Sequence, residues 1–142
     1  MIKSYIVTIL NILISIHSFP QQNSALRIKS KLIKTIEFKD TTLKSEKEMF
    51  QKCNNWEISI NDALKAFSFS KQITSEQKSA LYNWLPCYFK STVIYNKSKY
   101  YMEVNAASYI VLYNKSSSLY FGCSNSECEK FFILKGGNAS AD

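Results

Sequence analysis

The stretch that decides the fold is CYFKSTVIYNKSKYYMEVNAASYIVLYNKSSSLYFGC, residues 87–123. It is rich in tyrosine, valine, isoleucine and phenylalanine, which favour β-strands. Short polar stretches at 96–98 and 115–118 interrupt it and are typical of turns. These spacings predict an antiparallel β-meander with strands at Tyr88–Tyr95, Lys99–Ala106, Ser108–Asn114 and Leu119–Cys123.

Alternation within 99–106 predicts that one face of this sheet is buried and the other is solvated. Met102 and Val104 would face the core, whereas Tyr101 and Glu103 would lie on the outer face. The chain has nine tyrosines, and those of the β half cannot all be buried, so some can serve an interface. Tyrosines that simply cover a sheet explain the pattern equally well. The candidate interface residues are Tyr101, Glu103, Tyr109, Tyr113 and Tyr120.

Two short helices are predicted before the meander. The first is capped by Ser59 or Asn61, extends for about two turns and buries Ile60, Leu64 and Phe67. The second begins with a capping box of Thr74 and Gln77 and ends at Pro86. Its apolar stripe consists of Ala80, Leu81, Trp84 and Leu85.

The remaining segments complete the predicted fold. Partial alternation over 26–38 predicts an N-terminal, half-buried strand. The polar segment 40–52 fits a loop or a short helix equally well. Phe131–Leu134 would add a last edge strand. The prediction is therefore an α+β fold, with an N-terminal strand, two short helices and an antiparallel β-meander, stapled by disulfides.

Four cysteines lie downstream of the first 50 residues, at Cys53, Cys87, Cys123 and Cys128. An even number in a small exported domain is typical of a disulfide framework. Of the three pairings we favour Cys53 with Cys87 and Cys123 with Cys128, because a short polar loop separates the last two. We expect no metal site, since the chain lacks the C-x-x-C pairs typical of zinc ligands.

Residues 1–24 are typical of a secretory signal peptide. Lys3 gives a positive start, an apolar run follows to Ile16, and polar residues arrive too early for a membrane span of about 20 residues. The cleavage point is not fixed by the sequence. We therefore expect a single domain at 25–135, a flexible tail at 136–142, no membrane-spanning segment after cleavage, and a periplasmic or secreted location.

Most common catalytic designs have no residues to support them once this leader is removed. The leader takes with it His17, the one histidine of the chain, and the three glycines form no phosphate-binding loop. We therefore expect a protein that is not an enzyme and holds no cofactor. A pair of carboxylates could still support glycoside hydrolysis, with scattered candidates at Glu57, Asp62, Glu76, Glu103, Glu127 and Glu129.

Several short stretches resemble a pattern in small exported bacterial proteins of uncharacterised function. They cover roughly 53–134 and include the runs at 53–56, 85–88 and 101–108, together with the ends Phe121–Cys123 and Cys128–Phe132. The resemblance implies no activity.

Three classes of function remain. The leading hypothesis is an exported, non-catalytic domain that binds another protein, such as an immunity protein or an inhibitor of a toxin or cell-wall enzyme. The formal net charge of +7 suggests polyanion or membrane-surface binding as the alternative. Only Arg27 is an arginine and the lysines form no dense run, so we expect no specific nucleic acid partner. A hydrolase that uses Glu103 is the third class. The sequence specifies neither the partner nor the oligomeric state.

Overall fold

The computed structural model describes residues 25–37 and 44–137. The predicted signal peptide, residues 38–43 and the last five residues of the predicted tail lie outside this part of the chain.

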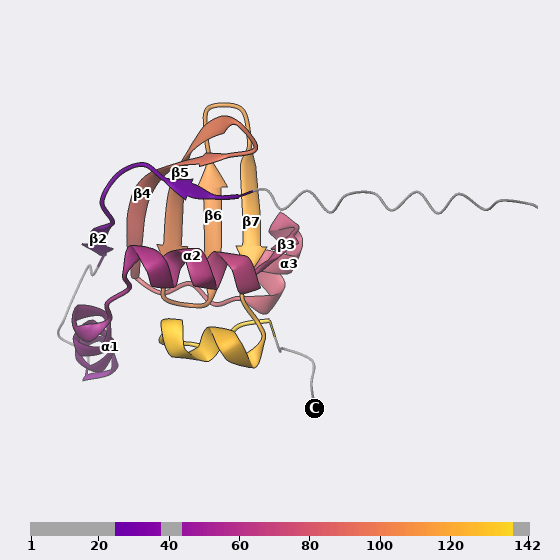
Figure 1. Cartoon of the computed structure of the whole chain (residues 1–142). Helices are drawn as coiled ribbons and strands as arrows, with labels where there is room; N and C mark the ends of the chain where they lie inside the picture. The colour runs from indigo at the N-terminus through magenta and orange to yellow at the C-terminus, as the bar shows by residue number, and fades with distance from the viewer. Residues whose placement is uncertain (1–24, 38–43, 138–142) are drawn as a thin grey trace, which may run out of the picture.

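The β-meander is confirmed (Figure 1). Its four strands are antiparallel neighbours and lie within one or two residues of the predicted bounds. Asn96 and Lys97 have positive φ values of 48° and 64°, which is typical of the two-residue hairpin turn that matches the natural twist of a sheet. The strands are β4 (Cys87–Tyr95), β5 (Ser98–Asn105), β6 (Tyr109–Tyr113) and β7 (Ser118–Gly122).

The predicted N-terminal strand is split into two short strands, β1 (Arg27–Ile28) and β2 (Ile33–Ile36), and both pair with β4. The interruption lies at Ser30. Its hydroxyl is 3.0 Å from the hydroxyl of Ser91 and accepts the backbone N–H of Thr92 at 2.9 Å. These side-chain bonds take the place of a regular strand ladder, because a serine hydroxyl competes with backbone partners.

The far edge of the sheet is formed by β3 (Lys71–Ile73), which pairs with β7 and was not predicted. The predicted edge strand at Phe131–Leu134 is wrong. Residues Ser126–Phe131 form a 3₁₀ helix, η1, after which the N–H groups of Ile133 and Leu134 donate to the carbonyl of Ala106. Because β3 already occupies the edge of β7, the chain after Cys123 turns away from the sheet.

Three α-helices precede or interrupt the strands. The undecided segment 40–52 contributes to α1 (Lys44–Asn55). The helix α2 (Ile60–Phe69) is capped by Ser59, whose hydroxyl accepts the N–H of Asp62 at 3.0 Å. Ser59 is one of the two caps that the sequence predicts. The helix is longer than two turns. Ala63 and Ala66 are its buried residues, whereas Ile60 is exposed, contrary to the prediction.

The third helix, α3 (Ser75–Leu81), has the predicted capping box of Thr74 and Gln77. It ends five residues before Pro86, so the predicted apolar stripe is wrong. Ala80 and Trp84 are exposed, and only Leu85 is fully buried. The helix ends early because the next residue, Tyr82, leaves the helical path and is buried against Gly122 and the ring of Tyr109.

Tyr82 packs against all three glycines of the chain, Gly122, Gly136 and Gly137. A Cβ atom at Gly122 or Gly136 would overlap its ring. The N–H of Gly137 also donates to the carbonyl of Leu81 at 2.8 Å. The first two residues of the predicted tail are thus packed against the domain.

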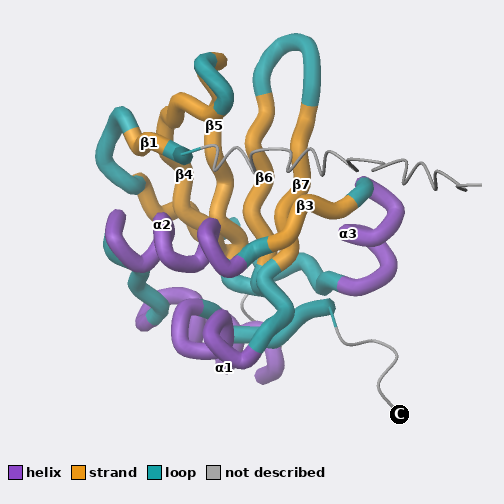
Figure 2. Tube along the Cα trace, turned by 45° about the vertical axis from the view of Figure 1, so that its right-hand side comes forward, coloured by secondary structure: helices purple, strands orange, loops and turns teal. Residues whose placement is uncertain are grey.

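The core lies between the sheet and a layer formed by α2 and η1 (Figures 1 and 2). Met102, Val104, Ile110 and Leu112 point into it and are fully buried. Trp56 closes one side, since its indole N–H donates to the carbonyl of Phe131 at 2.8 Å. The sheet and its helical layer confirm the α+β class.

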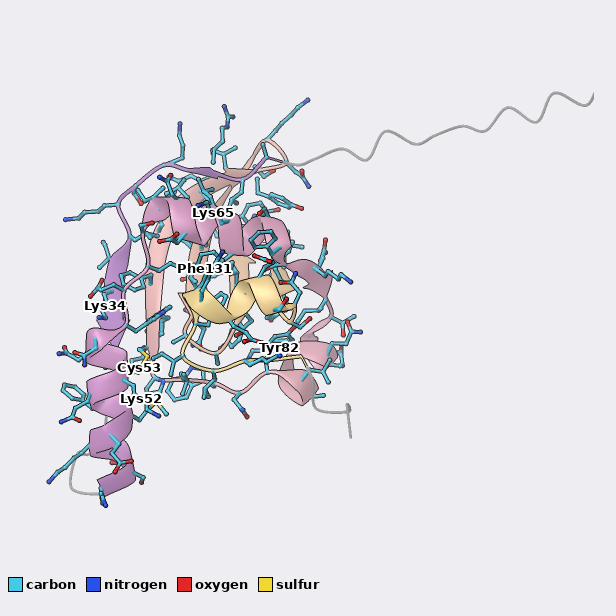
Figure 3. The ribbon with its side chains drawn as sticks, turned by 60° about the horizontal axis from the view of Figure 1, so that its bottom comes forward. Lys34, Lys52, Cys53, Lys65, Tyr82 and Phe131 are labelled. Carbon is cyan, nitrogen blue, oxygen red and sulfur yellow. A yellow bond between two sulfur atoms is a disulfide. The ribbon has the colours of Figure 1, made fainter. Side chains whose placement is uncertain are left out.

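Both predicted disulfides are present. Cys53–Cys87 joins the end of α1 to the start of β4, and Cys123–Cys128 joins the end of β7 to η1, with a Cα–Cα distance of 5.6 Å in each. Figure 3 shows Cys53 near the C-terminal end of α1. The two bonds therefore attach the outlying helical segments to the sheet.

Candidate binding surface

The sheet register brings all five predicted interface residues onto one face. Tyr101 pairs with Tyr113, Glu103 with Val111, and Val111 in turn with Tyr120, while Asn105 pairs with Tyr109. Residues that pair across neighbouring strands point to the same side of a sheet. We call this side, opposite to α2 and η1, the outer face. Its predicted members are Tyr101, Glu103, Tyr109, Tyr113 and Tyr120.

The tyrosines of the outer face differ in their access to solvent. Tyr101 is 56% exposed, and its ring packs against that of Tyr113 with the centroids 5.7 Å apart. Tyr113 and Tyr120 are half-buried. Tyr109 is only 2% exposed, because the ring of Tyr82 packs beside it. Tyr82 and the ammonium group of Lys78, 4.6 Å from the ring centre, therefore cover Tyr109 and keep it from contacting a partner directly.

Glu103 lies at the centre of this face and is half-buried, which corrects the prediction of a fully solvated side chain. Burial raises the pKa of its carboxyl above the usual 4.5, and the nearby carboxylate of Glu37 adds to the increase. Lys90 and Lys78 act in the opposite direction. Lys90 is the register partner of Glu103 on β4. The centre of the outer face thus holds a partly desolvated carboxyl group that two nearby lysines, Lys90 and Lys78, influence.

The structure brings together Tyr88 and Glu37, a pair that the sequence did not single out. Tyr88 is 4% exposed, and its hydroxyl donates a short hydrogen bond to the carboxylate of Glu37. Burial, together with this bond, raises the pKa of Tyr88. The ammonium group of Lys90 lies 4.8 Å from the centre of the Tyr88 ring. Only the pairing of β2 with β4 reveals this contact, because Glu37 and Tyr88 are 51 residues apart.

A depression with a volume of about 310 Å³ lies on the helical side of the molecule. It brings together two of the scattered carboxylates, Glu57 and Asp62. Lys34 binds Glu57 at 2.8 Å, and the capping Ser59 donates to Asp62 at 2.7 Å, so both carboxylates already have partners. Figure 3 shows Lys65 on α2 and Phe131 on η1 beside this region. The lining residues are Glu57, Ile58, Asp62, Lys65, Lys130 and Phe131.

Within residues 25–37 and 44–137, no group of three or more histidine, cysteine, aspartate or glutamate side chains could hold a metal ion. No helix in the same ranges is long and apolar enough to cross a membrane. Comparison of the chain with protein-family models, with curated proteins and with solved structures finds no match. Function therefore has to be inferred from the surface chemistry of the fold.

Proposed function

We propose that the chain is exported and then binds another protein through the outer face of its sheet. The observation that carries this proposal is the exposed ring of Tyr101, packed against Tyr113 beside the half-buried Glu103. Tyrosine is enriched at protein interfaces because it buries a large ring while its hydroxyl keeps a hydrogen-bond partner. A toxin or a cell-wall enzyme that this domain inhibits is the partner class that we favour.

The strands and the core beneath the outer face support this function. Tyr101 and Tyr113 stand on paired strands of the meander, above the fully buried Met102 and Leu112. A tyrosine side chain has two rotatable bonds, so little conformational entropy is lost when it is fixed in an interface. The two disulfides hold the surrounding segments to the same sheet. The domain thus presents its aromatic residues from a rigid support.

Glu103 constrains the chemistry of the partner. Its carboxyl is already desolvated in the free protein, and a partner that covers it removes the remaining water. A buried carboxylate needs a hydrogen-bond donor or an opposite charge to be stable. We infer that the partner places an arginine, a lysine or a set of backbone N–H groups opposite Glu103, and an apolar recess opposite Tyr101.

The proposal that the chain is exported rests on the signal-like leader and on the disulfides. Disulfide bonds persist in the periplasm and outside the cell, and are rare in the cytosol. All four cysteines of the chain form such bonds. A periplasmic or secreted location is therefore part of this proposal.

The test is a binding measurement with protein that begins at residue 25, using the product of a neighbouring exported toxin or lytic-enzyme gene as the partner. We expect Tyr101→Ser to weaken binding about 30-fold, the loss of roughly 2 kcal/mol that is typical of an interface hot spot. The matched control is Ile60→Ser, which removes an exposed apolar side chain from α2 on the opposite side. Equal affinities of the two variants would contradict the proposed face.

Glu103→Gln separates this proposal from a hydrolase. If the protein degrades cell-wall material and this variant abolishes that activity while circular dichroism shows an intact fold, the protein is an enzyme and the binding proposal is wrong. We expect no such activity in either the wild type or the variant.

A further inference from the structure

Basic side chains that are far apart in the sequence meet at one end of the sheet. The turns between β4 and β5 and between β6 and β7 lie at this end, and β1 crosses close to it (upper part of Figure 1; Figure 2). We call this region the basic end. All of its basic residues are exposed. They are Arg27, Lys29, Lys31, Lys97, Lys99 and Lys115.

The strand register places several of these charges on the same side of the sheet. Arg27 pairs with Ile94, which in turn pairs with Lys99. The N–H of Lys29 donates to the carbonyl of Thr92 at 2.7 Å and continues this alignment. Neighbouring strands are about 4.8 Å apart. Arg27 and Lys99 therefore stand roughly 10 Å apart on the outer face, on either side of Ile94.

The described strands and turns that carry these charges have no acidic residues of their own. The segments 25–36, 90–102 and 111–122 contain neither aspartate nor glutamate. None of the six basic side chains forms an ion pair with another described residue. The other ten basic residues in the described part of the chain are nearly balanced by nine acidic residues. The net positive charge of the folded domain is thus concentrated at the basic end.

We propose that the basic end binds an acidic polysaccharide. Five of its six cations are lysines, which act as point charges and lack the bidentate geometry with which arginine recognises one specific anion. Six exposed charges spread over three separate segments fit a long, flexible polyanion better than a small ligand. Binding of this kind is driven largely by release of counterions from the polymer.

Two observations favour a polysaccharide over other polyanions. Stable attachment to a membrane surface requires buried apolar area in addition to charge, whereas Ile28 and Ile94, which lie among the cations, are half-buried in the fold. The disulfides Cys53–Cys87 and Cys123–Cys128 indicate an oxidising compartment, where acidic glycans are the abundant polymers and nucleic acids are not.

The test measures binding of the full domain to heparin and to polygalacturonate at 50 and 200 mM NaCl. The variant combines Lys29→Gln, Lys99→Gln and Lys115→Gln, one change in each segment. Lys97 is kept because its φ of 64° is sensitive to substitution. The matched control combines Lys44→Gln, Lys47→Gln and Lys52→Gln, three exposed residues of α1. Figure 3 shows Lys52 on this helix.

We expect the basic-end variant to bind at least tenfold more weakly at 50 mM NaCl, with a salt dependence reduced by about two to three released ions. The α1 control should change affinity less than about twofold. Equal losses in the two variants would show that diffuse charge accounts for binding and would overturn the proposal.

The same assay includes single-stranded oligodeoxythymidine and vesicles that contain an anionic phospholipid. Tighter binding to either probe than to both polysaccharides would identify a nucleic acid or a membrane as the ligand and overturn the proposal. Tyr120→Ser should leave polysaccharide binding unchanged, because Tyr120 lies on β7, away from the part of the outer face that carries Arg27 and Lys99. This variant separates failure of the polysaccharide proposal from failure of the protein-binding proposal.

Discussion

The surroundings of the Glu103 side chain disfavour its charged form. Burial raises its pKa in the folded protein, so folding favours the protonated form. The stability that results is present below the unfolded-state pKa and is lost as the pH rises through the higher folded-state value. At neutral pH the ionised carboxylate therefore opposes folding.

Replacing this carboxyl should consequently stabilise the domain at neutral pH. We expect Glu103→Gln to have a higher thermal midpoint than the wild type at pH 7, and the difference to shrink as the pH falls toward 4. Thermal unfolding followed by circular dichroism at several pH values measures both effects. Glu127→Gln, at an exposed carboxylate of η1, is the control, and a difference of equal size there would contradict the role assigned to burial.

The contact between Tyr82 and the glycines gives a second prediction. A methyl group at Gly122 would overlap the Tyr82 ring, and forcing atoms into a packed core costs about 1–3 kcal/mol. We expect Gly122→Ala to lower the free energy of unfolding by this amount in urea titrations. In a Tyr82→Leu background the same substitution should cost much less. Additive effects of the two changes would show that the strain lies elsewhere.

Among the elements, the two disulfides differ in the length of chain that they close. Cys53 and Cys87 are 34 residues apart in the sequence, whereas Cys123 and Cys128 are five apart. The entropy lost by the unfolded chain grows with the closed loop, to about 4 kcal/mol for the longer one and about 2 kcal/mol for the shorter one.

Removing each bond should reveal this order. We expect Cys53→Ala with Cys87→Ala to reduce the free energy of unfolding by more than Cys123→Ala with Cys128→Ala does, as measured by urea unfolding without reductant. The cysteines of both pairs are at most 1% exposed, so the packing lost on substitution affects the two variants alike. A larger loss in the short-loop variant would contradict the loop-entropy explanation.

The elements that the sequence predicts well are those specified by neighbouring residues. Alternation and polar turns define β4 to β7, and the capping residues Ser59 and Thr74 mark the starts of α2 and α3. The elements that were predicted wrongly depend on contacts between residues that are far apart in the sequence. The end of α3 depends on the glycines around Tyr82, and β3 exists only because β7 offers it an edge. The segment 131–134 has strand-like composition, but β3 already occupies the side of β7 that this segment would have extended.

The same distinction applies to the two surfaces. The outer face is visible in the sequence because alternation along β5 separates Tyr101 and Glu103 from Met102 and Val104. The basic end is not, since its cations are spread from residue 27 to residue 115 and only the paired strands and turns bring them together. Glu37 and Tyr88 meet for the same reason.

For the molecule as a whole, the export proposal predicts the covalent state of the mature protein. Protein recovered from its native compartment should have lost the leader and should carry two disulfides, so its mass should be about 4 Da below that of the fully reduced mature chain. Mass spectrometry with and without reductant measures both features. Four free thiols, or an intact residue 1–24 segment, would contradict export.

The packing of the last described residues also determines when the domain can fold. The carbonyl of Phe131 receives the Trp56 indole, Ile133 and Leu134 bind Ala106, and Gly137 binds Leu81. During synthesis, residues 131–137 leave the ribosome after almost all of their partners. The domain therefore reaches its final packing only when translation of this segment is complete. Until then the indole of Trp56 lacks its acceptor, the carbonyl of Phe131, and the layer formed by α2 and η1 is incomplete.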